Sequence, residues 1–235
     1  MNKNKFSKPL VSIIMPVYNG DKYISKAMDS FLKQTYHNTE LIIVDDASTD
    51  NTSKIINKYI ENNTNIIYFY NKEKLGIPKS RNIALAQSNG DYIGHLDADD
   101  WLVQKAISTA MEVITKNEKI ALVYSGYIIH DETGGENRKY LAKKFNKENL
   151  KELGWQHFGL YLKEAAIRVG GFNEKLITCS DGDFFTKIGE NFQCERIAKY
   201  LYNYRWHKNN VGYKRPHCID CQKQKICAYF KVWKK

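Results

Sequence analysis

The stretch Gly90–Asp100 reads GDYIGHLDADD and places three carboxylates within four residues, directly after a short apolar segment. Like charges this close raise one another's pKa unless a cation lies among them. Asp97 and Asp99 are two residues apart, so an extended backbone would turn both side chains to the same side. Two oxygen ligands on one side suit Mg²⁺ or Mn²⁺, especially when substrate phosphates complete the coordination shell. An acidic turn with Asp100 as the N-cap of the next helix would explain only one aspartate, so we expect a metal site.

Strand-like segments alternate with helical patterns through the first half of the chain. Short β-branched or aromatic runs predict buried strands at residues 11–15, 41–44, 66–70, 92–96 and 121–127. Apolar residues at helical spacing predict helices at residues 24–32, 55–60, 78–89 and 103–114. Such alternation is typical of βαβ crossovers. It predicts an α/β fold with a mainly parallel central sheet flanked by helices.

Polar residues follow three of the predicted strands at the point where each strand ends. Tyr18 and Asn19 follow the first strand, and Asp45 and Asp46 follow the second. The acidic cluster at residues 97–100 follows the fourth. The carboxyl ends of parallel strands meet at one edge of a sheet, where such sheets bind their ligands. The sequence therefore predicts one site built by these three strand ends.

The composition is that of a globular protein with an excess of positive charge. The 235 residues are enough for one domain with a substantial core. The formal charge of +10 favours anionic partners such as nucleotides, acidic glycans, anionic lipids or nucleic acid. No apolar run is long enough to span a bilayer, and residues 1–9 lack the apolar core of a signal peptide. We therefore expect a cytoplasmic protein.

The end of the chain, Lys223–Lys235, interleaves lysines with large apolar residues. A basic segment with aromatic anchors would suit peripheral contact with the inner face of an anionic membrane. A terminal helix packed on the domain, or the beginning of a further segment, would explain the same pattern, and we favour this simpler explanation.

The chain has five cysteines, and an odd number in a chain that is not small and secreted predicts reduced thiols. Cys218 and Cys221 form a Cys-x-x-Cys pair, with Cys227 nearby. The second pair that would make a zinc site specific is missing, so zinc binding by this cluster stays open.

Four motifs occur together in the order that one family shows. Residues 11–19 read VSIIMPVYN, residues 44–50 read VDDASTD, the pair Arg81-Asn82 follows, and residues 96–100 read LDADD. With these motifs the chain resembles the family 2 glycosyltransferases of GT-A fold. The resemblance implies a Rossmann-like GT-A fold and an inverting, metal-dependent enzyme that uses a nucleotide-sugar.

Two further motifs extend the resemblance to roughly residues 10–210. Residues 171–175 read GFNEK and residues 181–185 read DGDFF, which look most like bacterial enzymes that build hyaluronan- or chondroitin-like chains. The implied division of the chain is a single GT-A domain at residues 1–215, with a nucleotide-binding half at about 10–130 and an acceptor half at about 131–215, and a basic aromatic tail at 216–235.

The resemblance implies that the first two strand ends contact the nucleotide. Pro16 and Tyr18 would border the base, with Tyr18 able to stack on it, and Asp46 would accept a hydrogen bond from the uracil ring. Arg81 would lie near the diphosphate. Helix capping by Asp46 and an exposed surface position for Arg81 are the alternatives.

The resemblance assigns the acidic cluster to metal binding. Asp99 would bind Mn²⁺ or Mg²⁺ directly, Asp97 would contact the ribose or the metal, and His207 would be a third ligand. The metal would neutralise the departing diphosphate as a Lewis acid. A structural role is the alternative for His207, and Asp100 would only support the turn or the next helix.

Inversion requires one base that takes the proton from the acceptor hydroxyl as it attacks the anomeric carbon. Asp181 matches the family's base, and Asp183 would cap the helix that follows or contact the acceptor. A surface Asp-Gly-Asp turn is the alternative. Trp155, Gln156 and His157 fall where relatives place acceptor-facing residues, although aromatic residues there would equally suit the core.

The leading interpretation is an inverting transferase that moves a sugar from a UDP-sugar to a hydroxyl of a glycan or glycolipid acceptor, in polysaccharide or surface-glycan synthesis. A sugar-phosphate nucleotidyltransferase is one alternative, but those enzymes have an early Gly-rich, basic phosphate loop, whereas residues 16–21 hold one glycine and no arginine. A non-enzymatic basic module for an anionic polymer is another. We expect no nucleic-acid partner, because the basic residues are dispersed and no recognised nucleic-acid motif occurs. The oligomeric state is not predicted.

Overall fold

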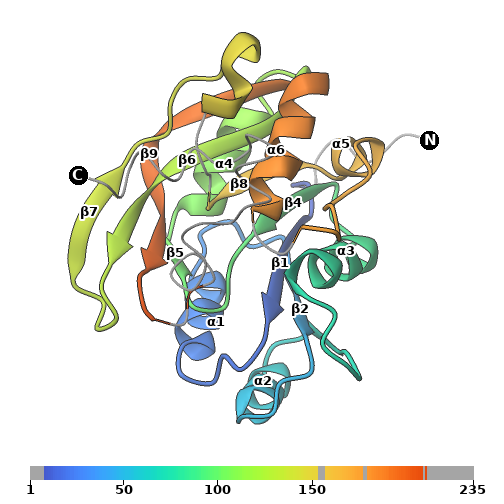
Figure 1. Cartoon of the computed structure of the whole chain (residues 1–235), viewed down its shortest axis with the longest axis vertical. Coiled ribbons are helices and arrows are strands. Elements are labelled where there is room, and N and C mark those ends of the chain that lie inside the picture. The colour runs from blue at the N-terminus through green and yellow to red at the C-terminus, as the bar shows by residue number, and fades with distance from the viewer. Residues whose placement is uncertain (1–7, 153–156, 177–178, 209, 211–235) are drawn as a thin grey trace.

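The computed structural model describes residues 8–152, 157–176, 179–208 and 210. Within these residues nine strands form one curled sheet in the order β3-β2-β1-β4-β8-β6-β9-β5, and β7 pairs with β6 off this path (Figure 1). The strands are β1 (Val11–Val17), β2 (Thr39–Asp45), β3 (Ile66–Tyr70), β4 (Tyr92–His95), β5 (Trp101–Leu102), β6 (Ile120–His130), β7 (Glu136–Tyr140), β8 (Gly159–Leu162) and β9 (Gln193–Arg205). The helices are α1 (Ile24–Leu32), α2 (Thr52–Ile60), α3 (Ile77–Gln87), α4 (Ala106–Ile114), α5 (Lys163–Arg168), α6 (Ser180–Asn191) and the 3₁₀ helix η1 (Lys147–Glu152).

The strands β3, β2, β1 and β4 form a parallel half of the sheet. Val17 lies opposite Asp45 on β2, and Ile14 lies opposite His95 on β4. The chain therefore leaves β1, β2 and β4 at the same edge, as the sequence predicted. The α/β architecture is confirmed, and the predicted parallel arrangement describes this half.

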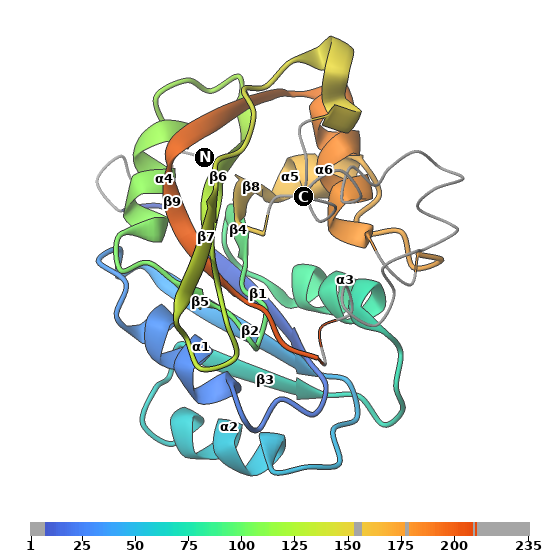
Figure 2. The ribbon, with the colours of Figure 1, turned by 60° about the vertical axis from the view of Figure 1, so that its left-hand side comes forward.

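The other half of the sheet is mixed. β8 pairs antiparallel with both β4 and β6, whereas β6 and β9 are parallel. β5 pairs antiparallel with the end of β9, where Trp101 lies opposite Asn203. Figure 2 shows β9 curving down the length of the molecule toward the end of β1. This return brings the residues at the end of β9 to the acidic cluster at residues 97–100.

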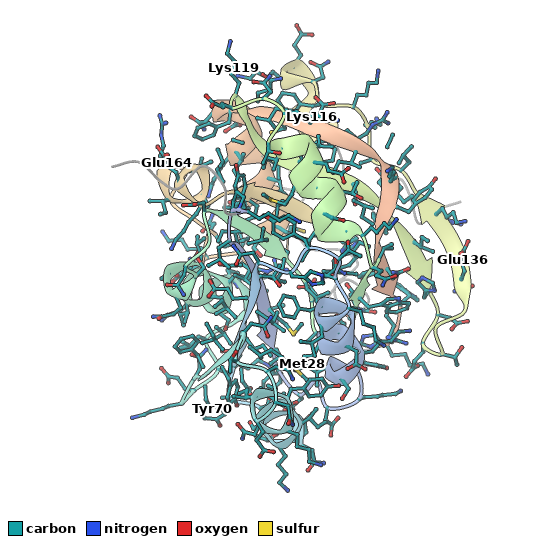
Figure 3. The ribbon with its side chains drawn as sticks, turned by 180° about the vertical axis from the view of Figure 1, so that it is seen from behind. Met28, Tyr70, Lys116, Lys119, Glu136 and Glu164 are labelled. Atoms are coloured by element: carbon teal, nitrogen blue, oxygen red, sulfur yellow. The ribbon has the colours of Figure 1, made fainter. Side chains whose placement is uncertain are left out.

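Helices cover both faces of the sheet. Side chains alternate along β1, so Ile13 and Ile14 face two different cores. Helices α1, α2 and α4 pack on the Ile13 side, where Met28 is fully buried, and α3, α5 and α6 pack on the Ile14 side. Figure 3 shows α1 and α4 on one face of the molecule, with Lys116 just beyond the end of α4. The two cores leave the carboxyl edge of the parallel strands for the site.

One element begins later than the sequence predicted. The helix expected at residues 103–114 begins at Ala106, because Trp101–Leu102 pairs with β9 as β5 and keeps the chain extended. The N-cap of α4 is Lys105. The expectation that Asp100 caps this helix is therefore wrong.

Some of the predicted features lie outside the described residues. These are Trp155, Gln156, the cluster of Cys218, Cys221 and Cys227, and the tail at 216–235. Cys179 is disulfide-bonded, so the expectation of reduced thiols is wrong for this residue, whereas Cys194 is free and buried. Across the described part of the chain we find no helix with the length and apolar character that crossing a bilayer requires.

Candidate active site

The two adjacent aspartates at the end of β2 have different environments. Asp45 is fully buried, and its carboxylate accepts hydrogen bonds from the backbone N of Ser48 (2.8 Å) and from the hydroxyls of Ser53 and Tyr68 (3.0 Å each). Burial and the charge of Asp45 raise the pKa of Tyr68 to about 12, so that hydroxyl remains a donor. Asp45 therefore maintains the shape of the loop after β2 and is closed to a ligand.

We expect Asp45→Ala to lower the free energy of unfolding by about 2–4 kcal/mol, because it leaves three donors without this acceptor. Urea unfolding followed by tryptophan fluorescence measures the loss. The control is Glu112→Ala, which removes an exposed carboxylate from α4 and should change stability by less than about 0.5 kcal/mol. Equal stability of the two variants would contradict a structural role for Asp45.

Asp46 lies at the edge of the sheet and fixes the loop that leads into α3. Its carboxylate accepts hydrogen bonds from the backbone N of Leu75 (2.7 Å) and Gly76 (2.8 Å) and from Nδ2 of Asn71 (3.0 Å). It does not cap α2, because Asp50 accepts a backbone N–H of the first turn there. The helix-cap alternative for Asp46 is therefore wrong. A carboxylate accepts about four hydrogen bonds, so Asp46 retains capacity for a ligand.

The loop after β1 exposes an aromatic ring at the same edge. Tyr18 is 43% exposed, and Nζ of Lys74 lies 3.3 Å from the centroid of its ring. Oδ1 of Asn19 accepts a hydrogen bond from the backbone N of Thr49 (2.8 Å), which joins this loop to the loop after β2. Pro16 is buried within β1. Tyr18, rather than Pro16, therefore offers a surface on which a planar ring can lie.

Arg81 is buried near the start of α3, so the surface position considered for it is wrong. It is 5% exposed, and its Nη2 lies 2.8 Å from Oδ1 of Asp97. Burial alone would lower the pKa of Arg81, but the carboxylates of Asp97 and Asp181 raise it, so the guanidinium is charged. Its Nε has no hydrogen-bond partner among the described residues. A buried guanidinium with a spare donor is suited to an anion such as a diphosphate.

Asp99 meets the end of the described chain. Its Oδ2 lies 2.9 Å from Nε2 of His207 and accepts a hydrogen bond from Nδ2 of Asn210 (3.1 Å). Two of the three predicted metal ligands, Asp99 and His207, are thus neighbours, while Asp97 turns its Oδ1 to Arg81. Sequence reasoning missed Asn210, because a single asparagine near the chain end carries no pattern of its own.

Asp100 joins the acidic turn to the end of β9. It is 1% exposed, and its Oδ1 accepts a hydrogen bond from the backbone N of Arg205 (2.7 Å). Nε of Arg205 in turn donates to the backbone O of Asp99 (3.0 Å). Burial, followed by the charges of Asp99 and Asp97, raises the pKa of Asp100 well above its usual range. The ionised form of Asp100 is therefore unfavourable, and the same carboxyl group ties the acidic turn to β9.

Asp181 lies in the first turn of α6 and is partly buried, so the surface-turn alternative is wrong. Burial raises its pKa; the charge of Arg81 opposes this change and that of Asp97 reinforces it. A carboxylate with a raised pKa is a better proton acceptor near neutral pH. Asp183 does not cap α6, because its carboxylate pairs with Nζ of Lys187 one turn later (2.7 Å).

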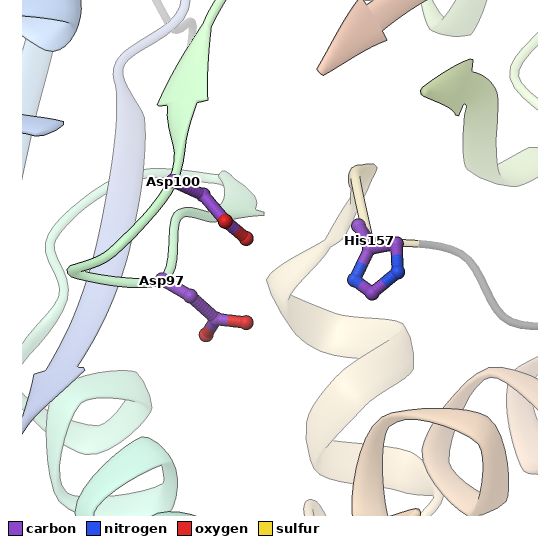
Figure 4. A group of neighbouring side chains, drawn as sticks. All are labelled: Asp97, Asp100 and His157. Atoms are coloured by element: carbon purple, nitrogen blue, oxygen red, sulfur yellow. The ribbon is translucent and has the colours of Figure 1, made fainter. Parts of the chain in front are cut away.

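His157, directly before β8, lies against the acidic turn. Its ring stacks on that of Tyr204 (4.1 Å between centroids) and meets that of Tyr127 edge-on (4.4 Å). Burial lowers the pKa of His157 to about 4, so the imidazole is neutral at neutral pH. Figure 4 shows the carboxylates of Asp97 and Asp100 directed toward it, and one ligand atom from each residue lies within 4.8 Å of the others. The sequence did not indicate this group, because its assembly depends on the pairing of β8 with β4.

Comparison with known proteins identifies the family of this chain. The model of the family described as glycosyl transferase family 2 matches residues 12–175. The chain belongs to this family. The predicted membership of the family 2 glycosyltransferases is therefore confirmed.

The relatives of this family 2 chain include synthases of long polysaccharides. It is 34% identical over 218 residues to the chondroitin synthase of Pasteurella multocida, covering 92% of the chain and 22% of that relative. It is 34% identical over 209 residues to the hyaluronan synthase of Pasteurella multocida, covering 88% of the chain and 21% of that relative. The chain thus spans about a fifth of the length of these two relatives. The predicted likeness to chondroitin- and hyaluronan-type enzymes is confirmed.

Solved structures resemble this family 2 glycosyltransferase chain in fold. TarS 1–349 of S. aureus in complex with UDP-GlcNAc has a TM-score of 0.69 and 25% identity, and the match covers 85% of this chain and 59% of that one. The mannosyltransferase PcManGT from Pyrobaculum calidifontis in complex with GDP-Man and Mn²⁺ has a TM-score of 0.70 and 19% identity, covering 89% of this chain and 61% of that one. These likenesses confirm the predicted GT-A-type fold.

Proposed function

We propose that this chain is an inverting, metal-dependent transferase that moves a sugar from a UDP-sugar to a hydroxyl of a glycan acceptor. The observation that carries the proposal is the buried, charged Arg81, which pairs with Asp97 after β4 and whose pKa the charge of Asp181 on α6 also raises. A guanidinium with a spare donor suits a diphosphate, and a carboxylate across from it suits the acceptor's proton. The group that would bind the leaving diphosphate, Arg81, and the group that would take the acceptor's proton, Asp181, therefore interact electrostatically with each other.

The nucleotide would bind at the ends of β1 and β2. The exposed ring of Tyr18 offers a face for the base, and Asp46, with one lone pair to spare, would accept a hydrogen bond from the uracil N–H. Asp45 is excluded from this role by its complete burial. The binding of UDP-GlcNAc by TarS, which this chain resembles at 25% identity, supports a UDP-sugar donor.

The residues of the acidic turn fit a divalent metal. Asp99 offers a partly exposed carboxylate, with 29% of its side chain accessible, and Nε2 of His207 lies within 2.9 Å of it. A mixed set of oxygen and imidazole ligands suits Mn²⁺, and carboxylates with phosphates suit Mg²⁺. Asp99 and His207, with Asp97 toward the ribose or the metal, would hold it. The metal, when bound, would stabilise the charge of the departing diphosphate.

The acceptor half would supply the base and the acceptor contacts. In the transfer step, Asp181 takes the proton of the acceptor hydroxyl as its oxygen bonds to the anomeric carbon and the bond to UDP breaks. Arg81 would place its positive charge beside the departing diphosphate, and it stays protonated during the transfer. The names of the relatives, chondroitin and hyaluronan synthases, support a growing polysaccharide or a surface glycan as the acceptor.

The test is a screen of UDP-sugars with the whole chain in the presence of Mn²⁺. UDP at about 100 times its Kd should stabilise the protein by about 2.7 kcal/mol in thermal unfolding, and at least one UDP-sugar should be hydrolysed or transferred with release of UDP. Pyrophosphate release from UTP and a sugar 1-phosphate would instead identify a nucleotidyltransferase. Salt-sensitive binding to a polyanion without any effect of UDP would identify a binding module.

A further inference from the structure

Asp100 and His157 each bury a polar atom that has no partner. Oδ2 of Asp100, in a residue that is 1% exposed, and Nε2 of His157 both lack a hydrogen bond within the described part of the chain. A buried polar atom without a partner costs about 1–3 kcal/mol, and a carboxylate costs more than a neutral group. Two such atoms on neighbouring residues indicate that a third group satisfies both.

The geometry limits what this group can be. One ligand atom each from Asp97, Asp100 and His157 lies within 4.8 Å of the others. Donors that share a cation at about 2.1 Å lie about 3–4 Å apart, so the three side chains would close in on a bound ion by roughly an ångström. Oδ1 of Asp97 pairs with Arg81, and Figure 4 shows the carboxylate of Asp97 directed toward His157.

The ring of His157 is packed among aromatic side chains. Its ring is held between the aromatic rings of Tyr204 and Tyr127, which fix its orientation. Among the described residues no positive side chain forms an ion pair with Asp100. Its carboxyl group accepts a hydrogen bond at Oδ1 from the backbone N of Arg205 (2.7 Å) and shares a further one with the hydroxyl of Tyr202. Two carboxylates and one neutral imidazole therefore converge at this point, and Arg81 compensates the charge of Asp97 alone.

The neighbouring pair of Asp99 and His207 differs in this respect. Its facing atoms lie 2.9 Å apart and satisfy each other, and Asn210 donates to the same carboxylate oxygen. The two sets share the acidic turn but use different histidines, one from before β8 and one from after β9. They can therefore be separated by substitution.

We propose that Asp97, Asp100 and His157 form a divalent-cation site of their own, separate from the pair of Asp99 and His207. Two carboxylate oxygens with one imidazole nitrogen favour a transition-metal ion such as Mn²⁺ over Mg²⁺ or Ca²⁺, which prefer oxygen alone. The site joins the acidic turn to the segment that enters β8. It is argued from donor atoms alone, so it does not depend on the proposed transfer reaction.

The experiment uses Mn²⁺ alone, without nucleotide, and the whole chain. Electron paramagnetic resonance measures the Mn²⁺ affinity, and electron spin echo modulation detects coupling to an imidazole ¹⁴N. Asp100→Asn and His157→Gln should weaken the site at least tenfold, and His157→Gln should remove the ¹⁴N coupling. The pair of Asp99 and His207 would hold its metal together with the diphosphate, so without nucleotide Asp99→Asn and His207→Gln should leave the affinity within threefold and retain the coupling. The control is His37→Gln, which replaces an exposed histidine.

Three results would overturn the proposal. Loss of the ¹⁴N coupling in His207→Gln, with its retention in His157→Gln, would assign the ion to the pair of Asp99 and His207. Unchanged Mn²⁺ affinity in His157→Gln would leave a water molecule as the group that satisfies His157. Absence of bound Mn²⁺ in the wild-type chain would exclude an autonomous site. Circular dichroism checks the fold of each variant, and the coupling in His157→Gln decides the matter if Asp100→Asn does not fold.

Discussion

Asp181→Asn should lower the turnover of sugar transfer by about 10²–10⁴-fold while the affinity for UDP stays within about threefold. Asparagine has nearly the same shape but cannot take a proton, and the proposed function assigns the acceptor's proton to Asp181. Transfer kinetics and calorimetric titration with UDP measure the two quantities. Asp183→Asn is the matched control on the same helix, because the described partner of the Asp183 carboxylate is Lys187, and it should retain most of the activity. Full turnover in Asp181→Asn would make the assignment of the base wrong.

The pH profile checks the same base independently. Burial raises the pKa of Asp181, Arg81 opposes this and Asp97 reinforces it, and the net direction is upward from the ordinary value of 3.8. The base acts only when ionised, so turnover should fall as the pH drops through this raised pKa. An acid limb at or below the pKa of an ordinary aspartate would contradict the environment described for Asp181.

Removal of divalent metal should reduce the affinity for UDP, and with it the rate of transfer, by about 10²-fold or more. Without a cation, the carboxylates of Asp97 and Asp99 repel the diphosphate, and Arg81 alone attracts it. Asp99→Asn should produce a similar loss in the presence of Mn²⁺, whereas Glu112→Gln, on the exposed face of α4, should produce none. Titrations with and without a chelator measure the effect. Equal UDP affinity in both conditions would remove the metal from the donor site.

The parallel half of the sheet could be predicted because its signals are local. Each strand there is a short apolar run that ends at a polar residue, and Asp46 and Asp97 follow their strands as expected. Pro78 marks the first turn of α3, which places Arg81 close to the end of β4. The spacing of apolar residues, and the residues that begin or end an element, determine all of these features within about ten residues.

The rest could not be predicted because it depends on contacts between distant residues. Nothing in the local pattern indicates that β8 inserts between β4 and β6, which is what brings His157 to Asp100. The same limit applies to the two aspartates after β2. Asp45 and Asp46 are adjacent residues of the same type, so the sequence pattern does not distinguish them. The hydrogen bond from Tyr68 to Asp45 is one of the contacts that give the two aspartates different roles.

The return of β9 to the acidic turn also determines the order in which this centre assembles during synthesis. The partners of Asp99 and Asp100 follow them by 105 to 111 residues, whereas the βαβ units of the parallel half pair over short separations. Contacts of large sequence separation form late, and chains fold from the N-terminus as the ribosome releases them. A nascent chain therefore holds the complete parallel half of the sheet while the carboxylates of Asp99 and Asp100 still lack His207 and the backbone of Arg205. The centre is finished only when the last described residue, Asn210, has emerged.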